Sequence, residues 1–184
     1  DYLASQSDIV VRFSGGANAG HTIVSGGITY KLHLVPSGIV YAGKTSILGT
    51  GMVVDPEALF NELKTLEGQG IEWRGRVLIS DRAHLVFPSY KQIDQDMEKK
   101  RRNPIGTTGR GIGVAYAQKA NREGMRFADI LDPKYYDHLT DEEKEFIAPY
   151  MEDIRSMVID LASYLSNARN KHILFEGAQG ALLD

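Results

Sequence analysis

Residues 9–22 read IVVRFSGGANAGHT, and the character of the sequence changes abruptly within them. The first five residues are mostly β-branched and apolar, which is typical of a short buried strand. The remaining nine include three glycines, an asparagine and a histidine, and none of them is large enough to build a core. This pattern predicts a glycine-rich turn at the carboxyl end of a strand, where α/β proteins bind their ligands.

Short apolar strands alternate with helices along the rest of the chain. Residues 1–8 are interpreted as the last turn of a helix. We predict strands at residues 9–13, 28–34, 76–80 and 172–175, and another strand formed by residues 46–48 and 52–54 with a sharp bend at 49–51. A tight turn is predicted at 26–27. We predict helices from Asp55-Pro56 to Gly68, over residues 88–102 and after the capping box that begins at Thr140. The alternation favours an α/β fold with a mostly parallel sheet flanked by helices.

The last predicted helix carries a long apolar stripe. Residues at helical spacing draw it over several turns, and Pro149 lies early enough to kink or restart the helix. The stripe consists of Ile147, Met151, Ile154, Val158, Leu161 and Leu165.

Composition narrows the classes of protein that fit. The chain has 184 residues, a formal net charge of -3 and no cysteine. A disulfide framework and a thiolate-ligated metal are therefore excluded, and nothing suggests a nucleic-acid-binding face. The lack of cysteine fits a reducing cytoplasm. Both ends look cut, because the chain begins without methionine and stops four residues after a glycine-rich turn. We therefore expect residues 1–184 to be part of a single larger domain.

Three glycine-rich segments are candidates for ligand binding. In residues 14–22, accessible backbone N–H groups suit a phosphate, and His21 can supply a proton or a positive charge. Residues 105–113 (IGTTGRGIG) offer glycine amides, two threonines and an arginine. Residues 176–180 (EGAQG) place a carboxylate and a carboxamide directly after a buried strand. The alternative for each segment is a flexible or glycine-capped surface turn with solvated side chains.

Five stretches, in this order, resemble the adenylosuccinate synthetase family. They are VVRFSGGANAGHT (10–22), LHLVPSGI (32–39), IGTTGRGIGVAY (105–116), KANREG (119–124) and FEGAQGALLD (175–184). The resemblance implies a P-loop-NTPase-like α/β fold with small hairpin and helical insertions. It also implies a cytoplasmic homodimer that uses GTP and Mg²⁺ to join IMP and L-aspartate. The γ-phosphoryl group first moves to O6 of IMP, and the aspartate amine then displaces phosphate, giving adenylosuccinate, GDP and phosphate.

The resemblance also implies roles for individual residues. His21 and Gln179 match catalytic residues of the family, and Gln179 corresponds to a glutamine that contacts the reacting edge of the purine. The carbonyl of Gly20 matches a Mg²⁺ ligand. The remaining matches concern nucleotide binding: Asn18, Ala19, Gly20 and His21 for IMP; Gly20, His21 and Thr22 for GTP; Thr108 for the IMP phosphate; and Arg122 for the IMP of a neighbouring subunit.

Two departures from the family pattern are visible. Ala17 stands where some relatives carry a histidine. The family's phosphate loop, with its catalytic aspartate and lysine, would precede Asp1, and its aspartate loop and guanine-binding segment would follow Asp184. We therefore expect the chain alone neither to turn over nor to bind GTP with normal affinity. Two alternatives remain: a P-loop-type phosphoryl-transfer enzyme with another acceptor, and a nucleotide-binding module without chemistry.

Overall fold

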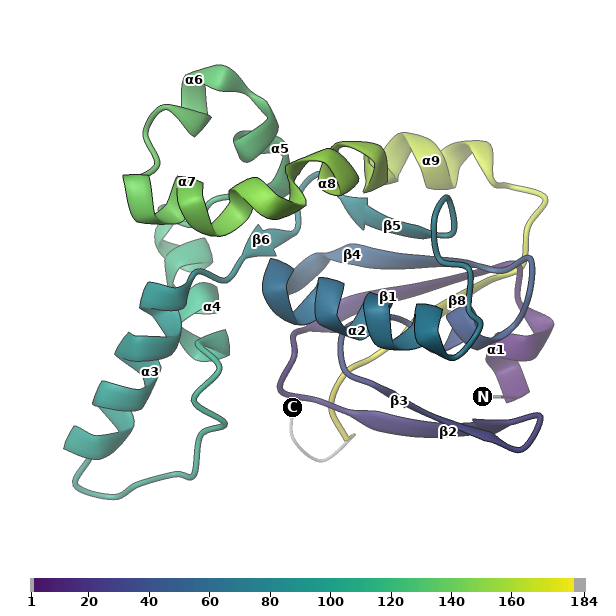
Figure 1. Ribbon diagram of the computed structural model, residues 1–184, viewed down its shortest axis with the longest axis horizontal. Helices are drawn as coiled ribbons and strands as arrows, with labels where there is room; N and C mark the ends of the chain where they lie inside the picture. The colour runs from purple at the N-terminus through teal and green to yellow at the C-terminus, as the bar shows by residue number, and fades with distance from the viewer. Residues whose placement is uncertain (1, 181–184) are drawn as a thin grey trace.

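The centre of the molecule is a parallel β-sheet. The computed structural model describes residues 2–180, and within them neighbouring strands follow the order β7-β5-β4-β1-β8, with β6 paired to β4 (Figure 1). Every pair in this sheet is parallel. The strands are β1 (Ile9–Gly15), β4 (Thr45–Val54), β5 (Val77–Ser80), β6 (His84–Leu85), β7 (Val158–Ile159) and β8 (Ile173–Glu176). The predicted α/β fold with a mostly parallel sheet is confirmed.

A small hairpin follows the first glycine-rich segment. Strands β2 (His21–Ser25) and β3 (Ile28–Leu32) pair antiparallel and form a separate two-stranded sheet. Gly26 and Gly27 connect them with φ of 57° and 79°, a conformation that glycine adopts without a steric penalty. The predicted tight turn is therefore confirmed, and His21 is the first residue of the hairpin.

The side chains of each strand alternate between the two faces of the sheet. Both faces therefore present apolar residues, and helices cover both. On one face, Leu48 packs in the same cluster as Leu59 and Leu63 of α2 (Pro56–Gly68). On the other face, Ile47 packs with Leu161 of α9 (Leu161–Asn167). A strand buried on both faces reads as a continuous apolar run, as residues 46–54 largely do.

The remaining helices are short, except for two that form an arm. Helices α3 (Pro88–Lys100) and α4 (Ile112–Asn121) lie side by side and project away from the sheet, joined by the second glycine-rich segment (Figure 1). We call these two helices and their connection the arm. The other helical elements are α1 (Tyr2–Gln6), η1 (Ser37–Val40), α5 (Phe127–Leu131), α6 (Pro133–Tyr136), α7 (Asp141–Ile147), η2 (Ala148–Tyr150) and α8 (Met151–Met157). No helix among residues 2–180 is long and apolar enough to span a membrane.

Three local predictions were only partly right. The apolar stripe is interrupted at Pro149, as expected, because η2 separates α7 from α8, but Val158 and Ile159 leave the helical path and pair with β5. Residues 46–54 lie in one strand, as expected, and the structure shows there a register shift against β1 between Arg12 and Ser14. Helix α3 ends at Lys100 rather than at residue 102.

Candidate functional site

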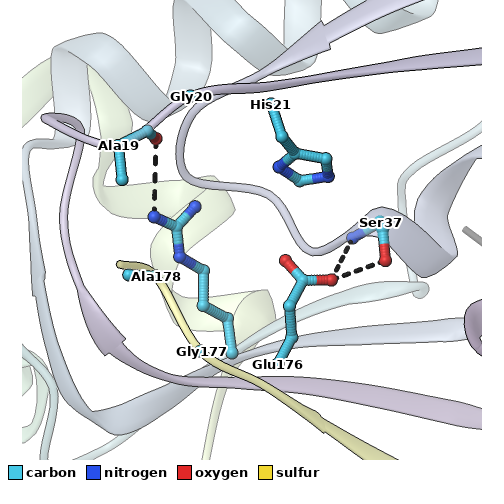
Figure 2. A pocket seen from close by; sticks show the side chains of 8 residues that line it. Ala19, Gly20, His21, Ser37, Glu176, Gly177 and Ala178 are labelled. Atoms are coloured by element: carbon cyan, nitrogen blue, oxygen red, sulfur yellow. Dashed lines mark hydrogen bonds between the residues drawn. The ribbon is translucent and has the colours of Figure 1, made fainter. Parts of the chain in front are cut away.

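A pocket of about 220 Å³ lies where the first and third glycine-rich segments meet at the carboxyl ends of β1 and β8 (Figure 2). Parallel strands bring their carboxyl ends to one edge of the sheet, so segments distant in sequence become neighbours there. The lining residues are Arg12, Ala19, Gly20, His21, Ser37, Glu176, Gly177 and Ala178.

The first glycine-rich loop leaves β1 through a position that requires glycine. Gly15 has a φ of 88°, and a Cβ built on it would lie 2.3 Å from the Cβ of Ala178. Its amide donates to the hydroxyl of Tyr116 on α4 at 2.7 Å. The absence of a side chain at Gly15 therefore allows the loop after β8 to approach β1 closely.

Arg12 holds the first glycine-rich loop through hydrogen bonds to its backbone carbonyls. Its side chain is almost fully buried, with 2% relative exposure, and it donates to the carbonyls of Gly16, Ala19 and His33. Burial lowers the pKa of Arg12, while the negative charges of Glu176 and Glu62 oppose that shift. A guanidinium remains charged at any relevant pH, so Arg12 is a fixed buried cation whose Nη1 and Nη2 atoms donate to backbone carbonyls.

Glu62 provides a negative charge at the neighbouring segment between β3 and η1. Projecting from α2, its carboxylate accepts hydrogen bonds from the amides of His33, Leu34 and Val35 at 3.1, 2.9 and 3.0 Å. Three backbone donors on one carboxylate fix the segment between β3 and η1. Arg12 binds the carbonyl of His33 and Glu62 its amide, so the path of the chain past the pocket is fixed from two directions.

Glu176 ends β8 and reaches across the pocket. It is in register with Arg12 on the neighbouring strand. Its Oε2 accepts from the amide of Ser37 at 3.1 Å and from the Ser37 hydroxyl at 2.5 Å. These two bonds connect the end of the sheet to η1 and fix the position of the carboxylate.

His21 lies opposite Glu176 (Figure 2). The imidazole is half-buried, and its Nε2 is buried with no hydrogen-bond partner among the described residues. Burial lowers the pKa of His21 below its ordinary 6.5; the positive charge of Arg12 acts in the same direction, whereas Glu176 and Glu62 act against it. An unpartnered ring nitrogen in a cavity can bind an incoming anionic group, whose negative charge favours the protonated imidazole.

Comparison with known proteins identifies the family. The family model described as adenylosuccinate synthetase matches residues 1–184. The chain belongs to the adenylosuccinate synthetase family.

Individual relatives agree with this assignment. The chain is 45% identical to the adenylosuccinate synthetase of Acetivibrio thermocellus and 43% identical to that of Clostridium novyi, and each match covers 100% of the chain. The structure of fully ligated adenylosuccinate synthetase from Plasmodium falciparum superimposes with a TM-score of 0.88 at 36% identity, over 100% of this chain and 48% of that one. The chain spans about half the length of the curated relatives it matches.

The fold also extends to a more distant protein. A cyanophage S-2L succinoaminodeoxyadenylate synthetase, bound to dGMP and dATP, aligns with a TM-score of 0.64 at 22% identity. At that identity the likeness concerns the fold alone.

The structure brings together some of the residues that the resemblance to adenylosuccinate synthetases singled out. Ala19, Gly20 and His21 line the pocket, and Asn18 precedes them with an exposed side chain. Thr22 is exposed on β2. Gln179 follows the lining residue Ala178 and is exposed, outside the lining itself. Residues 181–184 of the last motif lie outside the described residues.

Two predicted residues lie elsewhere. Thr108 is exposed on the connection of the arm, whose neighbour Arg110 donates to the carbonyl of Ala17 in the first loop. Arg122 ends α4 in the left-handed conformation, with a φ of 65°, and lines a separate hollow that includes Lys119 and His84. Within this chain, neither residue lines the pocket that contains His21.

The described residues offer little to a metal ion by themselves. Among them, no group of three His, Cys, Asp or Glu side chains could hold one. Gly20 is exposed at the pocket and can contribute its carbonyl oxygen. Mg²⁺ commonly retains water and binds substrate phosphates, so one protein oxygen fits a shared site but not a complete one.

Sequence reasoning missed three residues that build the site: Arg12, Ser37 and Glu62. Arg12 left a signal, because a charged residue inside the apolar run IVVRF is costly to bury without a purpose. Ser37 and Glu62 left no local signal. Their importance comes from contacts with segments far away in the sequence.

Proposed function

We propose that the full-length protein is a GTP-dependent ligase that joins IMP and L-aspartate to form adenylosuccinate, GDP and phosphate. The observation that carries the proposal is the family match over residues 1–184, together with an unpartnered His21 in a pocket between two glycine-rich segments. The reaction belongs to the synthesis of AMP.

In the proposed first step, the γ-phosphoryl group of GTP moves to O6 of IMP. The bond between the β,γ-bridging oxygen and phosphorus breaks, the bond from O6 to phosphorus forms, and GDP leaves. The N1 proton of IMP passes to the catalytic base of the family's phosphate loop. His21 carries a proton at Nε2 when phosphate oxygens bring negative charge to it, and it stabilises the charge on the group in transfer. Gly20 contributes a carbonyl to Mg²⁺, which, when bound, offsets phosphate charge.

In the second step, the amine of aspartate attacks C6 of the purine and phosphate leaves. Phosphorylation makes this step feasible, because O6 alone is a poor leaving group. Asn18, Ala19 and Gln179 hold IMP in this proposal, Thr22 helps hold GTP, and Thr108 binds the IMP phosphate. The exposure of Asn18, Gln179 and Thr108 leaves each side chain accessible to a substrate.

A homodimer completes the proposed site. Arg122 is exposed at the end of α4, in a hollow separate from the pocket of its own chain, which supports a role toward a second subunit's IMP. A guanidinium fork is suited to a phosphate. Sedimentation equilibrium of the full-length protein should give twice the chain mass, and fractionation should recover the protein in the cytoplasm.

Replacement of His21 by asparagine tests the proposal. In the full-length protein, His21→Asn should lower kcat by about 10²–10⁴-fold while GTP and IMP binding stay close to wild type. An equal loss of turnover and binding would contradict the catalytic role.

The wild-type assay separates the alternatives. GTP consumption that depends on both IMP and aspartate supports the ligase. GTP binding that is indifferent to IMP would favour a nucleotide-binding module, and consumption with another acceptor would favour a different phosphoryl-transfer enzyme.

A further inference from the structure

We infer that Glu98 is a positioning residue for Thr108: its carboxylate fixes the connection of the arm beside that threonine and thereby shapes the connection for a phosphate of the substrate. The inference assigns a role to a residue that the proposed function does not use. It rests on that function for the identity of the ligand, the phosphate of IMP. Four observations carry it.

The first observation is that α3 contacts the connection of the arm at three successive glycines. Side chains of the helix each hold one of them, in reverse order along the chain. Asp94 accepts from the amide of Gly111 at 3.0 Å, Gln95 donates to the carbonyl of Gly109 at 3.4 Å, and Glu98 accepts from the amide of Gly106 at 2.7 Å. The helix therefore determines the path of the connection from residue 106 to residue 111.

The second observation is the place of Thr108 between two of these contacts. Thr107 and Thr108 lie between Gly106 and Gly109, whose φ values are 72° and 64°. Thr108 is exposed, so its side chain is accessible to a ligand. A segment held at both ends presents its hydrogen-bonding groups in one geometry, which lowers the entropic cost of binding a phosphate.

The third observation is that Glu98 makes the stronger of the two contacts beside Thr108. Its hydrogen bond to the amide of Gly106 is short and charge-assisted, whereas the hydrogen bond of Gln95 is longer and joins neutral groups. The side chain of Glu98 is only 19% exposed, so water does not readily replace it. Removal of the carboxylate therefore leaves the Gly106 amide without its acceptor.

The fourth observation is that neighbouring cations offset the charge of Glu98. Its Oε2 lies 3.6 Å from Nε of Arg101. The basic run Lys99, Lys100, Arg101 and Arg102 follows Glu98 directly in the sequence. Opposite charges so close weaken the field of the carboxylate, and Glu98 can fix the connection without repelling a phosphate there.

A purely structural role for Glu98, as a brace of the arm, predicts something different. In that case its loss weakens the arm as a whole and affects all substrates alike. Glu98→Ala removes the acceptor of the Gly106 amide but suits α3 itself, because alanine favours helices and a negative charge leaves the last turn. Glu98→Gln removes the charge and keeps an oxygen that can accept from that amide.

The chain offers a matched control on the same helix. Asp96 also carries a carboxylate, but it contacts Gln92 and Lys99 of α3 rather than the connection. Asp96→Ala therefore changes the charge of the helix by the same amount and leaves the contact with Gly106 in place.

The deciding measurement is the steady-state kinetics of the full-length protein, with each substrate varied in turn. Glu98→Ala should raise KM for IMP about tenfold, the loss expected for one hydrogen bond to a charged group, and leave kcat and KM for GTP within about twofold. Glu98→Gln should bring KM for IMP back to within about threefold of wild type. An unchanged KM for IMP in Glu98→Ala, an equal rise of KM for GTP, or the same rise in Asp96→Ala would overturn the inference.

A second readout needs no substrate. Hydrogen exchange of residues 103–111, followed by mass spectrometry in the full-length protein, reports how firmly the connection is held. Exchange should be about fivefold faster in Glu98→Ala than in wild type and unchanged in Asp96→Ala. Equal exchange in Glu98→Ala and wild type would contradict the role. If Glu98→Ala does not fold, Glu98→Asp, which withdraws the carboxylate by one methylene, should give smaller rises of KM for IMP and of exchange, and no rise would overturn the inference.

The two proposals fail separately. A wild-type protein that does not consume GTP with IMP and aspartate would refute the proposed function, while the exchange measurement would still test whether Glu98 holds the connection. Conversely, a fully active ligase in which Glu98→Ala leaves KM for IMP and the exchange unchanged would retain the proposed function and refute the positioning role.

Discussion

The first and second glycine-rich segments look alike in sequence but are held in different ways. Residues 14–22 are held by Arg12, a buried residue of β1 itself, and by two residues of the arm, Tyr116 and Arg110. The connection of the arm is bound mainly by the helix that precedes it, through Glu98 to the amide of Gly106 and Asp94 to the amide of Gly111. The first loop is therefore held partly by the arm, whereas the connection of the arm is held mainly by its own preceding helix.

The two loops therefore differ in how firmly the structure holds them in place. The loop beside the sheet is largely preorganised, so its amides and His21 need little rearrangement to receive a phosphate. The connection of the arm exposes Thr108 and meets the first loop through Arg110. Glycine content alone does not distinguish the two cases; the buried charges around the first loop do.

The largest effect should come from removing the buried charge. Arg12→Met leaves buried carbonyls of the first loop without donors, and we expect the free energy of unfolding to fall by about 4 kcal/mol. Arg110→Met, which removes one donor from the arm side, should cost about 1 kcal/mol. Urea denaturation measures both, and equal losses would show that the two sides of the loop are held equally.

A smaller effect should come from adding a methyl group to each loop. Gly15→Ala places a Cβ 2.3 Å from that of Ala178 at a φ of 88°. We expect it to destabilise the fold by roughly 2–3 kcal/mol. Gly106 has a φ of 72° but open space around it, so Gly106→Ala should cost only about 1 kcal/mol of backbone strain. If Gly106→Ala proved the more costly in thermal unfolding, the contrast between the loops would be wrong.

The smallest expected effect is a change in the free energy of unfolding at acidic pH. Burial lowers the pKa of both His21 and His84 below 6.5. Each imidazole therefore stabilises the fold above pH 6.5, and this contribution is lost as the pH falls through the lower folded-state value.

The charges around the two histidines differ between the pocket and the side of the arm. Carboxylates oppose the shift of the His21 pKa, whereas Lys119 and Arg126 add to that of His84 and Asp129 opposes it. The urea midpoint of unfolding is measured as a function of pH. Its pH dependence should weaken more, relative to wild type, in His84→Gln than in His21→Asn. The reverse order would mean that the pocket is the more acid-sensitive region.

Local patterns predicted most of the sheet. The strand at residues 9–13 and the strands near 76–80 and 172–175 were visible because each is a short apolar run with a clear end. Strand β7 was missed, because Val158 and Ile159 fit a helical stripe equally well and only pairing with β5 decides their conformation. The single strand over residues 46–54 was predicted, but its register shift against β1 could not be, because it depends on the pairing of the two strands.

The site was predictable only in part. His21 and the glycines around it could be found because a run of small residues after a strand is itself unusual. The contacts of Glu62 with the amides of residues 33–35, and of Glu176 with Ser37, connect positions that no local pattern relates. The fold brings those pairs together, so only the three-dimensional structure identifies them.

The side chain of Tyr116 connects regions that are far apart in the sequence. The hydroxyl of Tyr116 receives the amide of Gly15 at 2.7 Å and donates to the carbonyl of Gly51 at 2.8 Å. It therefore links a helix of the arm to two adjacent strands, one of which carries the pocket residue Arg12. Any tilt of that helix must break both bonds or move the two glycines with it. The arm is consequently anchored to the sheet directly and not only through the chain that connects them.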